Sequence, residues 1–302
     1  MTSNSSSSQK KFKAGYVNII GRPNTGKSTF LNAMLGYPLA ITTPKAQTTR
    51  HRILGIDNGE DYQIIYSDTP GLIQPAYALQ KYMMDAVNEA LEDADVLLLM
   101  TNPGEENNSD DTLLRKLEKA GVPVLVLLNK IDTATQEQVE KAVDYWKDQL
   151  PNAQVLPVSA LHGFGLDQVK QHILDLLPES PPYFDTEQMT DRSERFLVSE
   201  KIREKILKHF KKEIPYSVEV VVEEFKETEN QIRIRAIIYV ERDSQKGIII
   251  GHKGSGLKRI GMEARKDLEQ LFGKKIYLEL YVKVRKNWRK DDKWLKQFGY
   301  KK

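Results

Sequence analysis

The glycine-rich segment Gly21–Ser28 constrains the fold of this chain more than any other stretch. Its sequence is G-R-P-N-T-G-K-S, and it follows the apolar run Tyr16–Ile20. The pattern G-x-x-x-x-G-K-S is typical of a loop that leaves a buried strand, turns backbone N–H groups toward phosphate and enters a helix. The helix expected from about Lys27 to Leu35 would add its N-terminal dipole. The segment therefore predicts an α/β fold with a nucleotide phosphate site. The alternative is a glycine turn that binds nothing.

Each residue type in this loop has a chemical reason to be there. Glycines allow the backbone to curl around an anion, and Lys27 places a compact positive charge beside the β- and γ-phosphates. The hydroxyl of Ser28 is a suitable ligand for Mg²⁺. We expect nucleotide contacts along the whole run: Gly21, Arg22, Pro23, Asn24, Thr25, Gly26, Lys27, Ser28 and Thr29.

The composition restricts the chain further. Its 302 residues, 29% of them charged, suit about two globular domains. There are no cysteines, which excludes a disulfide framework and a thiolate metal site. No apolar run approaches the roughly 20 residues of a membrane-spanning helix, and the serine-rich start lacks the apolar core of a secretory signal. We expect residues 1–12 to be a disordered tail and the protein to be cytoplasmic, which does not exclude peripheral membrane contact.

Apolar strands alternate with helices downstream of the loop. The strands expected at 96–100 and 122–128 are continuously apolar, which is typical of a mostly parallel sheet covered by helices on both faces. The first domain is expected to span residues 13–178. Its further strands are expected at 52–56, 62–66 and 153–158, and its further helices at 79–94, 110–120 and about 163–177.

A polar, threonine-rich loop covers residues 36–50. It is either a switch segment, ordered when a threonine reaches Mg²⁺ and the γ-phosphate, or a plain surface loop. The strand at 62–66 then leads into Ser67-Asp68-Thr69-Pro70-Gly71. Asp68 there can hold Mg²⁺ through water, and the N–H of Gly71 can approach the γ-phosphate because glycine lacks a Cβ. The alternative is an Asx turn ended by Pro-Gly. We expect nucleotide contacts from Asp68, Thr69, Pro70, Gly71 and Leu72.

The element Asn129-Lys130-Ile131-Asp132 follows the second continuously apolar strand. The carboxylate of Asp132 can accept hydrogen bonds from two donors on guanine that adenine lacks, so it predicts guanine specificity. Asn129 can either bond the N7 edge of the base or tie its loop to the phosphate loop. The stem of Lys130 can cover the base plane. After the next strand, a backbone N–H at Ser159-Ala160 can bond guanine O6; alone, the tetrapeptide is also compatible with a helix-capping turn.

The proline-rich stretch Pro178–Pro182 is the best domain boundary. We expect a linker at 179–189 and a second domain at 190–302. Its pattern predicts the order α-β-β-α-α-β with the turn Gly251-His252-Lys253-Gly254 between the paired helices, which is that of an α+β, type II KH domain binding RNA. The alternative is a tight helix–helix turn. The expected elements are helix 190–210, strands 217–225 and 231–240, helices 244–250 and 255–272, and strand 275–284.

Basic residues are concentrated at the C-terminal end. Residues 246–302 hold 17 Lys and Arg against 6 Asp and Glu, although the whole chain carries only +3. Such a concentration indicates either nucleic-acid contact or a solvated basic face. We expect Trp294, Leu295 and Phe298, which have helical spacing, to dock on the KH helices. We expect RNA contacts from the turn and from the basic and aromatic residues near it: Gly251, His252, Lys253, Gly254, Lys258, Arg259, Arg285, Lys286 and Trp288.

Taken together and in this order, the motifs resemble those of the Era family of bacterial GTPases (Era/TrmE-type), which carry a C-terminal KH domain. They are G-R-P-N-T-G-K-S, K-A-Q-T-T-R-H-R, D-T-P-G-L, N-K-I-D, V-S-A and G-H-K-G-S-G-L-K-R-I. The resemblance covers nearly everything after the serine-rich start. It implies a monomeric GTP-binding and GTP-hydrolysing switch that binds 16S rRNA near its 3′ end. It also implies action in assembly of the 30S subunit, and peripheral contact with the inner membrane.

The resemblance also implies residue roles. Lys45–Arg50 would be switch I, with either Thr48 or Thr49 as a Mg²⁺ ligand beside Ser28 and Asp68. Leu72 stands where many small GTPases carry a water-orienting glutamine. Hydrolysis would therefore depend on positioning, with K⁺ held near Asn24 as a further cofactor. The residues that would act on the reaction are Lys27, Asn24, Thr48, Thr49 and Gly71. The alternatives are a P-loop small-molecule kinase, a G domain coupled to a protein- or membrane-docking module, or a structural G domain that binds GTP without turnover.

Overall fold

The computed structural model describes residues 11–105 and 111–300. The expected tail at 1–12 therefore lies mostly outside the described residues, as do Asp110 and the last two lysines. Lys11 and Phe12 do not behave as a disordered tail. The Lys11 ammonium pairs with Glu179 at 2.8 Å, and the Phe12 carbonyl accepts a hydrogen bond from the N–H of Ser180 at 3.1 Å.

The first domain is built on a six-stranded sheet with the order β2-β3-β1-β4-β5-β6. Only β2 runs antiparallel to its neighbour, β3, because a short turn joins the two; the other strands are parallel. This arrangement confirms the mostly parallel sheet. The strands are β1 Lys13–Gly21, β2 Ile53–Asn58, β3 Tyr62–Asp68, β4 Val96–Thr101, β5 Val124–Leu128 and β6 Gln154–Pro157.

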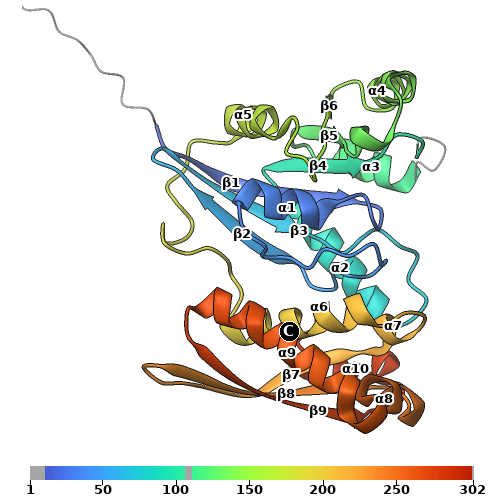
Figure 1. The fold of residues 1–302 in the computed structure, drawn as a ribbon. Coiled ribbons are helices and arrows are strands. Elements are labelled where there is room, and N and C mark those ends of the chain that lie inside the picture. Colours follow the sequence, from blue (N-terminus) through green and yellow to red (C-terminus); the bar gives the residue numbers. More distant parts are fainter. Residues whose placement is uncertain (1–10, 106–110, 301–302) are drawn as a thin grey trace, which may run out of the picture.

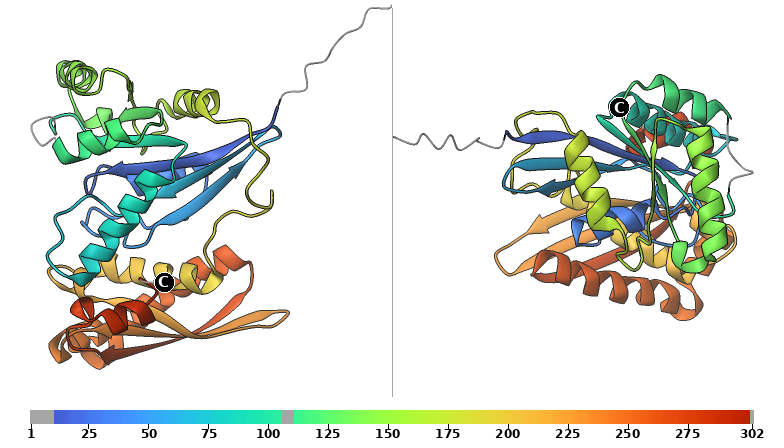
Figure 2. Two further views of the ribbon diagram at one scale, coloured as in Figure 1. Left: turned by 180° about the vertical axis from the view of Figure 1, so that it is seen from behind. Right: turned by 90° about the horizontal axis from the view of Figure 1, so that it is seen from above.

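Helices cover both faces of this sheet (Figures 1 and 2). Successive residues of a strand point to opposite faces, so Leu98 packs with helices α1 and α5, and its neighbours Leu97 and Leu99 pack with α2, α3 and α4. Strands buried on both faces account for the uninterrupted apolar runs. The helices are α1 Lys27–Leu35, α2 Ala78–Glu92, α3 Asp111–Lys119, α4 Gln136–Gln149 and α5 Leu166–Leu176.

Helix α4 is not among the elements expected from the sequence. It begins with a capping box, in which Thr135 accepts from the N–H of Gln138 and the Gln138 side chain accepts from the N–H of Thr135. The pattern T-x-x-Q is a local indication of such a start. Its buried residues Ala142 and Trp146 complete the cover over one face.

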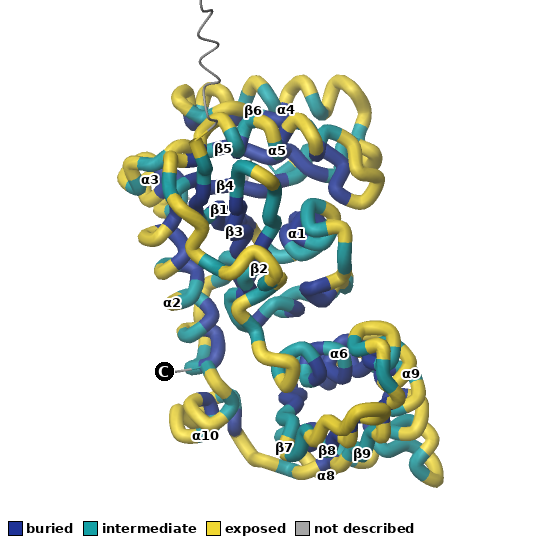
Figure 3. Tube along the Cα trace, turned by 90° about the vertical axis from the view of Figure 1, so that its left-hand side faces the viewer, coloured by how far each residue is buried: buried dark blue, intermediate teal, exposed yellow. Residues whose placement is uncertain are grey.

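The second domain holds a three-stranded sheet with the order β7-β8-β9, in which β7 and β8 are antiparallel and β8 and β9 parallel. Helices α6 and α9 pack on one face of it, which confirms the α-β-β-α-α-β order (Figure 1). Helix α6 is buried on almost every side, since it lies between this sheet and the first domain (Figure 3). The elements are α6 Glu194–His209, β7 Glu219–Glu227, β8 Gln231–Val240, α8 Asp243–Ile250, α9 Ser255–Phe272 and β9 Lys275–Val284, with a short helix α7 Ile214–Ser217.

The segment between the domains lies along the first sheet. The N–H groups of Tyr183 and Phe184 both donate to the side-chain oxygen of Gln63, at 2.7 and 2.9 Å. The N–H of Ile56 in β2 donates to the carbonyl of Met189 at 3.0 Å. The segment is therefore bonded to the first domain over most of its length.

The C-terminal segment packs between the two domains. Its contacts differ from two predictions made from the sequence. Trp288, expected to contact RNA, is 0% exposed and packs with Leu79 and Met83 of α2, while its indole N–H donates to the carbonyl of Ser217 at 3.0 Å. No ring face is left for a base, so that prediction is wrong for this arrangement. The segment contains the 3₁₀ turn η4 Trp288–Lys290 and helix α10 Asp292–Gln297.

Trp294, Leu295 and Phe298 do dock, but not on the KH helices. Leu295 is fully buried in the same cluster as Leu79. The rings of Trp294 and Phe298 lie 6.0 and 5.1 Å from that of Tyr239, on the face of β8 opposite to the helices. The apolar residues of α2 and of this sheet face together form the surface on which these side chains pack, and local spacing alone does not indicate it.

Within the described ranges, no helix has the length and apolar character to cross a membrane.

Candidate functional site

The predicted nucleotide residues gather where four strands of the first sheet end. The phosphate loop follows β1, Asp68 ends β3, Asn129 follows β5 and Ser159 follows β6. Parallel strands bring these loops to one edge of the sheet, which is where open α/β sheets bind ligands. A cavity of about 600 Å³ opens there. Its lining includes Pro23, Asn24, Gly26, Lys27, Ser28, Thr29, Thr48, Thr49, Thr69, Gly71 and Lys130.

The phosphate loop curls around Lys27. Its buried ammonium donates to the carbonyls of Gly21 at 3.0 Å and Arg22 at 2.7 Å. Burial lowers the pKa of Lys27 to about 8, although the negative charge of Asp68 opposes the shift. Phosphate oxygens at this position would restore the stability of the charged form. Thr25 is buried and contributes to the loop rather than to the cavity, since its hydroxyl donates to the carbonyl of Arg22 at 2.9 Å.

Three oxygen-bearing side chains meet at the base of the cavity. The hydroxyl of Ser28 donates to Asp68 Oδ2 at 2.6 Å, and that of Thr49 donates to the same oxygen at 3.1 Å. The two hydroxyl oxygens are 2.9 Å apart. Asp68 is fully buried, its Oδ1 has no hydrogen-bond partner among the described residues, and burial raises its pKa. A buried carboxylate with a free oxygen beside two hydroxyls suits a hard divalent cation such as Mg²⁺.

Thr48 points away from this group. Its hydroxyl donates to the carbonyl of Lys45 at 2.6 Å and lies 2.7 Å from the hydroxyl of Thr43. These contacts link Thr48 to residues 43 and 45 of its own loop. The structure therefore distinguishes two adjacent threonines that the sequence leaves equivalent.

The segment after Asp68 packs against the phosphate loop. The Thr69 hydroxyl donates to the carbonyl of Ile19 at 2.6 Å, and Pro70 is buried. A Cβ on Gly71 would lie 2.7 Å from the backbone nitrogen of Pro23, so only glycine fits. The N–H of Leu72 donates to the carbonyl of Gly21 at 3.0 Å, and its side chain joins the apolar cluster under α2. Leu72 thus offers no polar group to a reacting water.

Asn129 ties loops together. Its Nδ2 donates to the carbonyl of Thr25 at 2.8 Å, and its Oδ1 accepts from the N–H of Ala160 at 2.9 Å. Of the two roles open to Asn129 in the sequence, the structure shows the tie to the phosphate loop. The N–H of Ala160, expected to bond guanine O6, donates to Asn129 in this structure, and its contact with guanine stays a prediction.

Asp132 has one carboxylate oxygen that accepts a hydrogen bond from Ser159 and a second that lies near His162. The Ser159 hydroxyl donates to Oδ1 at 2.5 Å, and Oδ2 lies 3.6 Å from Nε2 of His162. The hydrogen bond from Ser159 is the main reason that the pKa of Asp132 is lowered. Lys130 has a left-handed backbone, φ 60°, and its ammonium donates to the carbonyl of Asn24 at 2.5 Å. Its stem thus spans from the loop Asn129–Asp132 to the phosphate loop.

Leu161 was missed by the sequence reasoning. It lines the nucleotide cavity together with Lys130, and its side chain is 74% exposed. An exposed leucine at the mouth of a polar cavity suits the face of a base. Its position directly after Ser159-Ala160 was the only available indication.

A second cavity, of about 370 Å³, lies between α9 and the edge strand β9. Gly254 of the G-x-x-G turn and Lys258 line it, together with apolar residues such as Leu278. In the turn, Gly251 has φ 72° and Lys253 has φ 49°, and the side chains of His252 and Lys253 are exposed. The turn thus presents a basic, accessible edge to the cavity.

The other side chains that were predicted to contact RNA lie in different surroundings. Arg259 pairs with Glu263 at 3.2 Å on the surface of α9. The guanidinium of Arg285 lies 4.6 Å from the ring centre of Trp294, and Lys286 is exposed. Neither Arg259 nor Arg285 lines the cavity of Lys258.

Comparisons with known proteins agree with this division. A family model described as "50S ribosome-binding GTPase" matches residues 16–130, and one described as "KH domain" matches residues 213–289. The chain is 48% identical to GTPase Era of Syntrophus aciditrophicus over 292 residues, which cover 96% of this chain and 95% of the relative. The chain belongs to the Era family of GTPases. GTPase Era of Geotalea daltonii is 45% identical over 294 residues, covering 97% and 99%.

Solved Era structures have the same fold. Two are 39% identical to this chain with a TM-score of 0.92, and cover 96% of it and 99% of their own length. One is Era in complex with MgGDPNP and nucleotides 1506–1542 of 16S ribosomal RNA. The other is an Era variant from Aquifex aeolicus bound to GDP·AlF4⁻. As a member of the Era family, the chain is a GTPase with a P-loop G domain followed by a KH domain.

Proposed function

We propose that the chain is a GTP-dependent switch that binds the 3′ end of 16S rRNA through its KH domain and acts in assembly of the small ribosomal subunit. One observation supports a coupling between GTP binding and RNA binding. Within the segment Lys45–Arg50, the hydroxyl of Thr49 bonds Asp68 at the nucleotide site, while the guanidinium of Arg50 bonds Glu219 of the second domain at 3.1 Å. The same few residues therefore contact both domains, as a switch segment must.

Mg²⁺ is held, in this proposal, by Ser28 and Thr49, with Asp68 either as a ligand or through water. The three side chains already lie within hydrogen-bond distance of one another, and the free oxygen of Asp68 supports the assignment. When bound, the ion supplies positive charge to the β- and γ-phosphates. Thr48 keeps a structural part in the loop, and the absence of a polar side chain at Leu72 leaves catalysis to positioning and electrostatics.

The remaining roles follow from position. Lys27 and the loop amides bind the phosphates, and Gly71 brings its segment close to the phosphate loop. Asp132 selects guanine, with Lys130 and Leu161 beside the base. Asn24 is exposed at the mouth of the site with φ 65°, and we propose that it helps to hold K⁺ there. Hydrolysis rates in K⁺ and in Na⁺ test this part, and equal rates would contradict it.

The RNA site is the cavity between α9 and β9, with the turn Gly251–Gly254 against the phosphate backbone. Lys253 and Lys258 supply charge, and the apolar lining suits unstacked bases. Arg259, Arg285 and Lys286 belong to a wider basic surface. A cytoplasmic location, a monomeric state and peripheral contact with the inner membrane are further parts of the proposal, suggested by the family resemblance alone.

The decisive experiment measures the affinity for a short pyrimidine-rich RNA from the 16S 3′ end, with the protein bound to a non-hydrolysable GTP analogue and then to GDP. We expect tighter binding in the GTP form. Equal affinities would keep both binding activities and remove the switch. No binding in either form would leave the GTPase and favour the alternative, in which the KH domain docks a protein or a membrane.

A further inference from the structure

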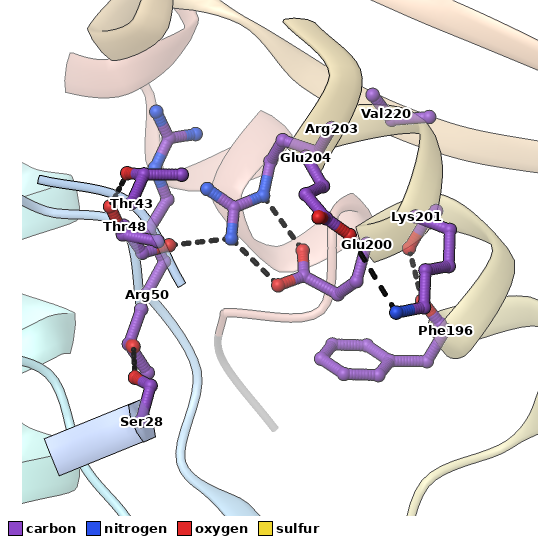
Figure 4. Close-up of polar contacts among 12 residues, drawn as sticks. Ser28, Thr43, Thr48, Arg50, Phe196, Glu200, Lys201, Arg203, Glu204 and Val220 are labelled. Carbon is purple, nitrogen blue, oxygen red and sulfur yellow. Dashed lines mark hydrogen bonds and ion pairs between the residues drawn. The ribbon is translucent and has the colours of Figure 1, made fainter. Parts of the chain in front are cut away.

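The segment Lys45–Arg50 is bonded to the second domain at three points, of which Figure 4 shows the contact between Thr48 and Arg203. Lys45 donates to the carbonyls of Leu207 and Phe210 at the C-terminal end of α6. The guanidinium of Arg50 donates to the carbonyls of Pro215 at 3.0 Å and Val218 at 2.6 Å. Between these two, the carbonyl of Thr48 accepts from Arg203 Nη2 of α6 at 2.6 Å.

Arg203 is set up to make this contact. Its side chain is 1% exposed, and Glu200, one turn earlier on α6, accepts from its Nε and Nη2 at 2.7 Å each. This fork fixes the plane of the guanidinium and aims Nη2 at the first domain. Arg203 and Glu200 are drawn facing Thr48 in Figure 4.

A gain in folding stability does not explain why an arginine is buried at this position. Desolvating an ion pair costs about as much as the pair returns, and apolar residues of similar size often serve as well. Arg203 Nη1 has no hydrogen-bond partner within the described part of the chain, so the group is not even fully satisfied. A guanidinium can make a directional hydrogen bond to one backbone carbonyl of the switch segment, and an apolar side chain cannot.

That carbonyl belongs to the residue before Thr49. The residue after it, Arg50, is 2% exposed and also bonded to the second domain. The residues on both sides of Thr49 are therefore held from one direction, Thr48 through its backbone carbonyl and Arg50 through its side chain, while the Thr49 hydroxyl extends the other way to Ser28 and Asp68. Contacts at residues 48 and 50 restrict the position of the residue between them.

We infer that Arg203, in the KH domain, is a positioning residue for GTP hydrolysis in the G domain: its bond to the Thr48 carbonyl holds Thr49 at the nucleotide site. The inference rests on the proposed role of Thr49 as a Mg²⁺ ligand. The inference means that the second domain affects the rate of GTP hydrolysis in the first. Hydrolysis is then fastest when the two domains are docked as in this structure.

The test is a double-mutant cycle between Arg203→Met and Thr49→Ala. Arg203→Met keeps the length of the side chain and removes its donors. We expect kcat to fall roughly 10- to 100-fold, the cost of a small misplacement of a reacting group, with GDP affinity unchanged. If Arg203 acts through Thr49, the double variant is no slower than Thr49→Ala alone. Arg203→Lys keeps one donor and a positive charge, and we expect it to restore part of the rate.

A second readout does not depend on activity. In the protein bound to Mg²⁺ and a non-hydrolysable GTP analogue, we expect Arg203→Met to speed hydrogen exchange of the backbone amides at residues 45–50. The matched control is Arg195→Met on the same helix, because among the residues that the structure describes Arg195 donates to the carbonyls of Val222 and Glu223 and to no part of the segment Lys45–Arg50. Neither kcat nor exchange should change in this control.

The outcomes separate the inference from the proposed function. A normal kcat for Thr49→Ala would overturn the role of Thr49 and, with it, this inference. A slow Thr49→Ala beside a normal Arg203→Met would overturn the inference alone, as would additive losses in the double variant. If Arg203→Met does not fold, Arg203→Lys and Glu200→Gln enter the same cycle, and unchanged rates in both would also count against the inference.

Discussion

Asn129 and Thr25 are joined by a buried hydrogen bond, from Asn129 Nδ2 to the Thr25 carbonyl at 2.8 Å, although 104 positions separate them in the chain. The bond links the loop Asn129–Asp132 to the phosphate loop. In the proposed site these two loops bind the base and the phosphates, so each loop helps to hold the other in place. We therefore expect that mutations that touch neither the base nor the phosphates weaken nucleotide binding.

Asn129→Asp tests this link. The substitution keeps the shape but places a carboxylate oxygen against the Thr25 carbonyl in a site that is only 2% exposed. We expect the loss of GDP binding free energy to be about 1–3 kcal/mol, that of a buried hydrogen bond left unmade, as measured by titration calorimetry. Asn152→Asp, on an exposed loop, is the control, and equal affinities in the two variants would contradict the link.

Gly26 and Gly36 form a matched pair at the two ends of α1. Both have left-handed backbones, with φ 102° and 75°. A Cβ at Gly26 would lie 2.3 Å from Asn129 Nδ2, whereas one at Gly36 would meet nothing within 4 Å. We expect Gly26→Ala to abolish measurable GDP binding and Gly36→Ala to lower only the melting temperature, by the strain of an unfavourable φ. Retained GDP binding in Gly26→Ala would show that the loop can shift to make room.

Asp132→Asn should change the preferred base. A carboxylate offers only acceptors to the two donors of guanine, whereas an amide presents one acceptor and one donor. We expect GDP affinity to fall on the order of 10³-fold or more and affinity for xanthosine diphosphate to rise, as measured by competition with a fluorescent nucleotide. Asp148→Asn on the exposed face of α4 is the control. An unchanged ratio of the two affinities would argue that Asp132 does not face the base.

Trp288 should matter for stability and not through RNA contact. Trp288→Ala removes the largest side chain of the cluster between the domains, and we expect it to cost about 3–5 kcal/mol of unfolding free energy, seen in urea denaturation. Trp288→Phe keeps most of the packing and should bind the 16S 3′-end RNA as the unmodified protein does. A selective loss of RNA affinity in Trp288→Phe, with stability retained, would return this residue to the RNA surface.

Lys258 should contribute one phosphate contact to RNA binding. Lys258→Gln is expected to lower affinity and to reduce the slope of log affinity against log salt by about 0.7–1. Lys226→Gln is the control: Lys226 is 72% exposed on β7 and does not line the cavity between α9 and β9. Equal slopes for both variants would place the RNA elsewhere on the basic surface.

The two domain types, the guanine-nucleotide chemistry and the family could all be predicted from the sequence. These follow from short motifs such as Gly21–Ser28 and Asn129–Asp132, in which residue types a few positions apart dictate the local backbone and the groups it presents. The continuously apolar strands also determined the parallel sheet, because strands covered on both faces have no polar side to show. Even the missed helix α4 has a local indication in its Thr135–Gln138 capping box.

The directions in which individual side chains point could not be predicted in this way, because they depend on how the chain packs. Thr48 and Thr49 are identical neighbours, and their different contacts depend on Arg203 and Asp68, which lie far away in the chain. Trp288 stands in a basic, aromatic stretch that suits RNA, yet the apolar side of α2 buries it. The N–H of Ala160 is engaged by Asn129. Each outcome depends on contacts between distant segments, and local spacing carries no information about those until the chain has folded.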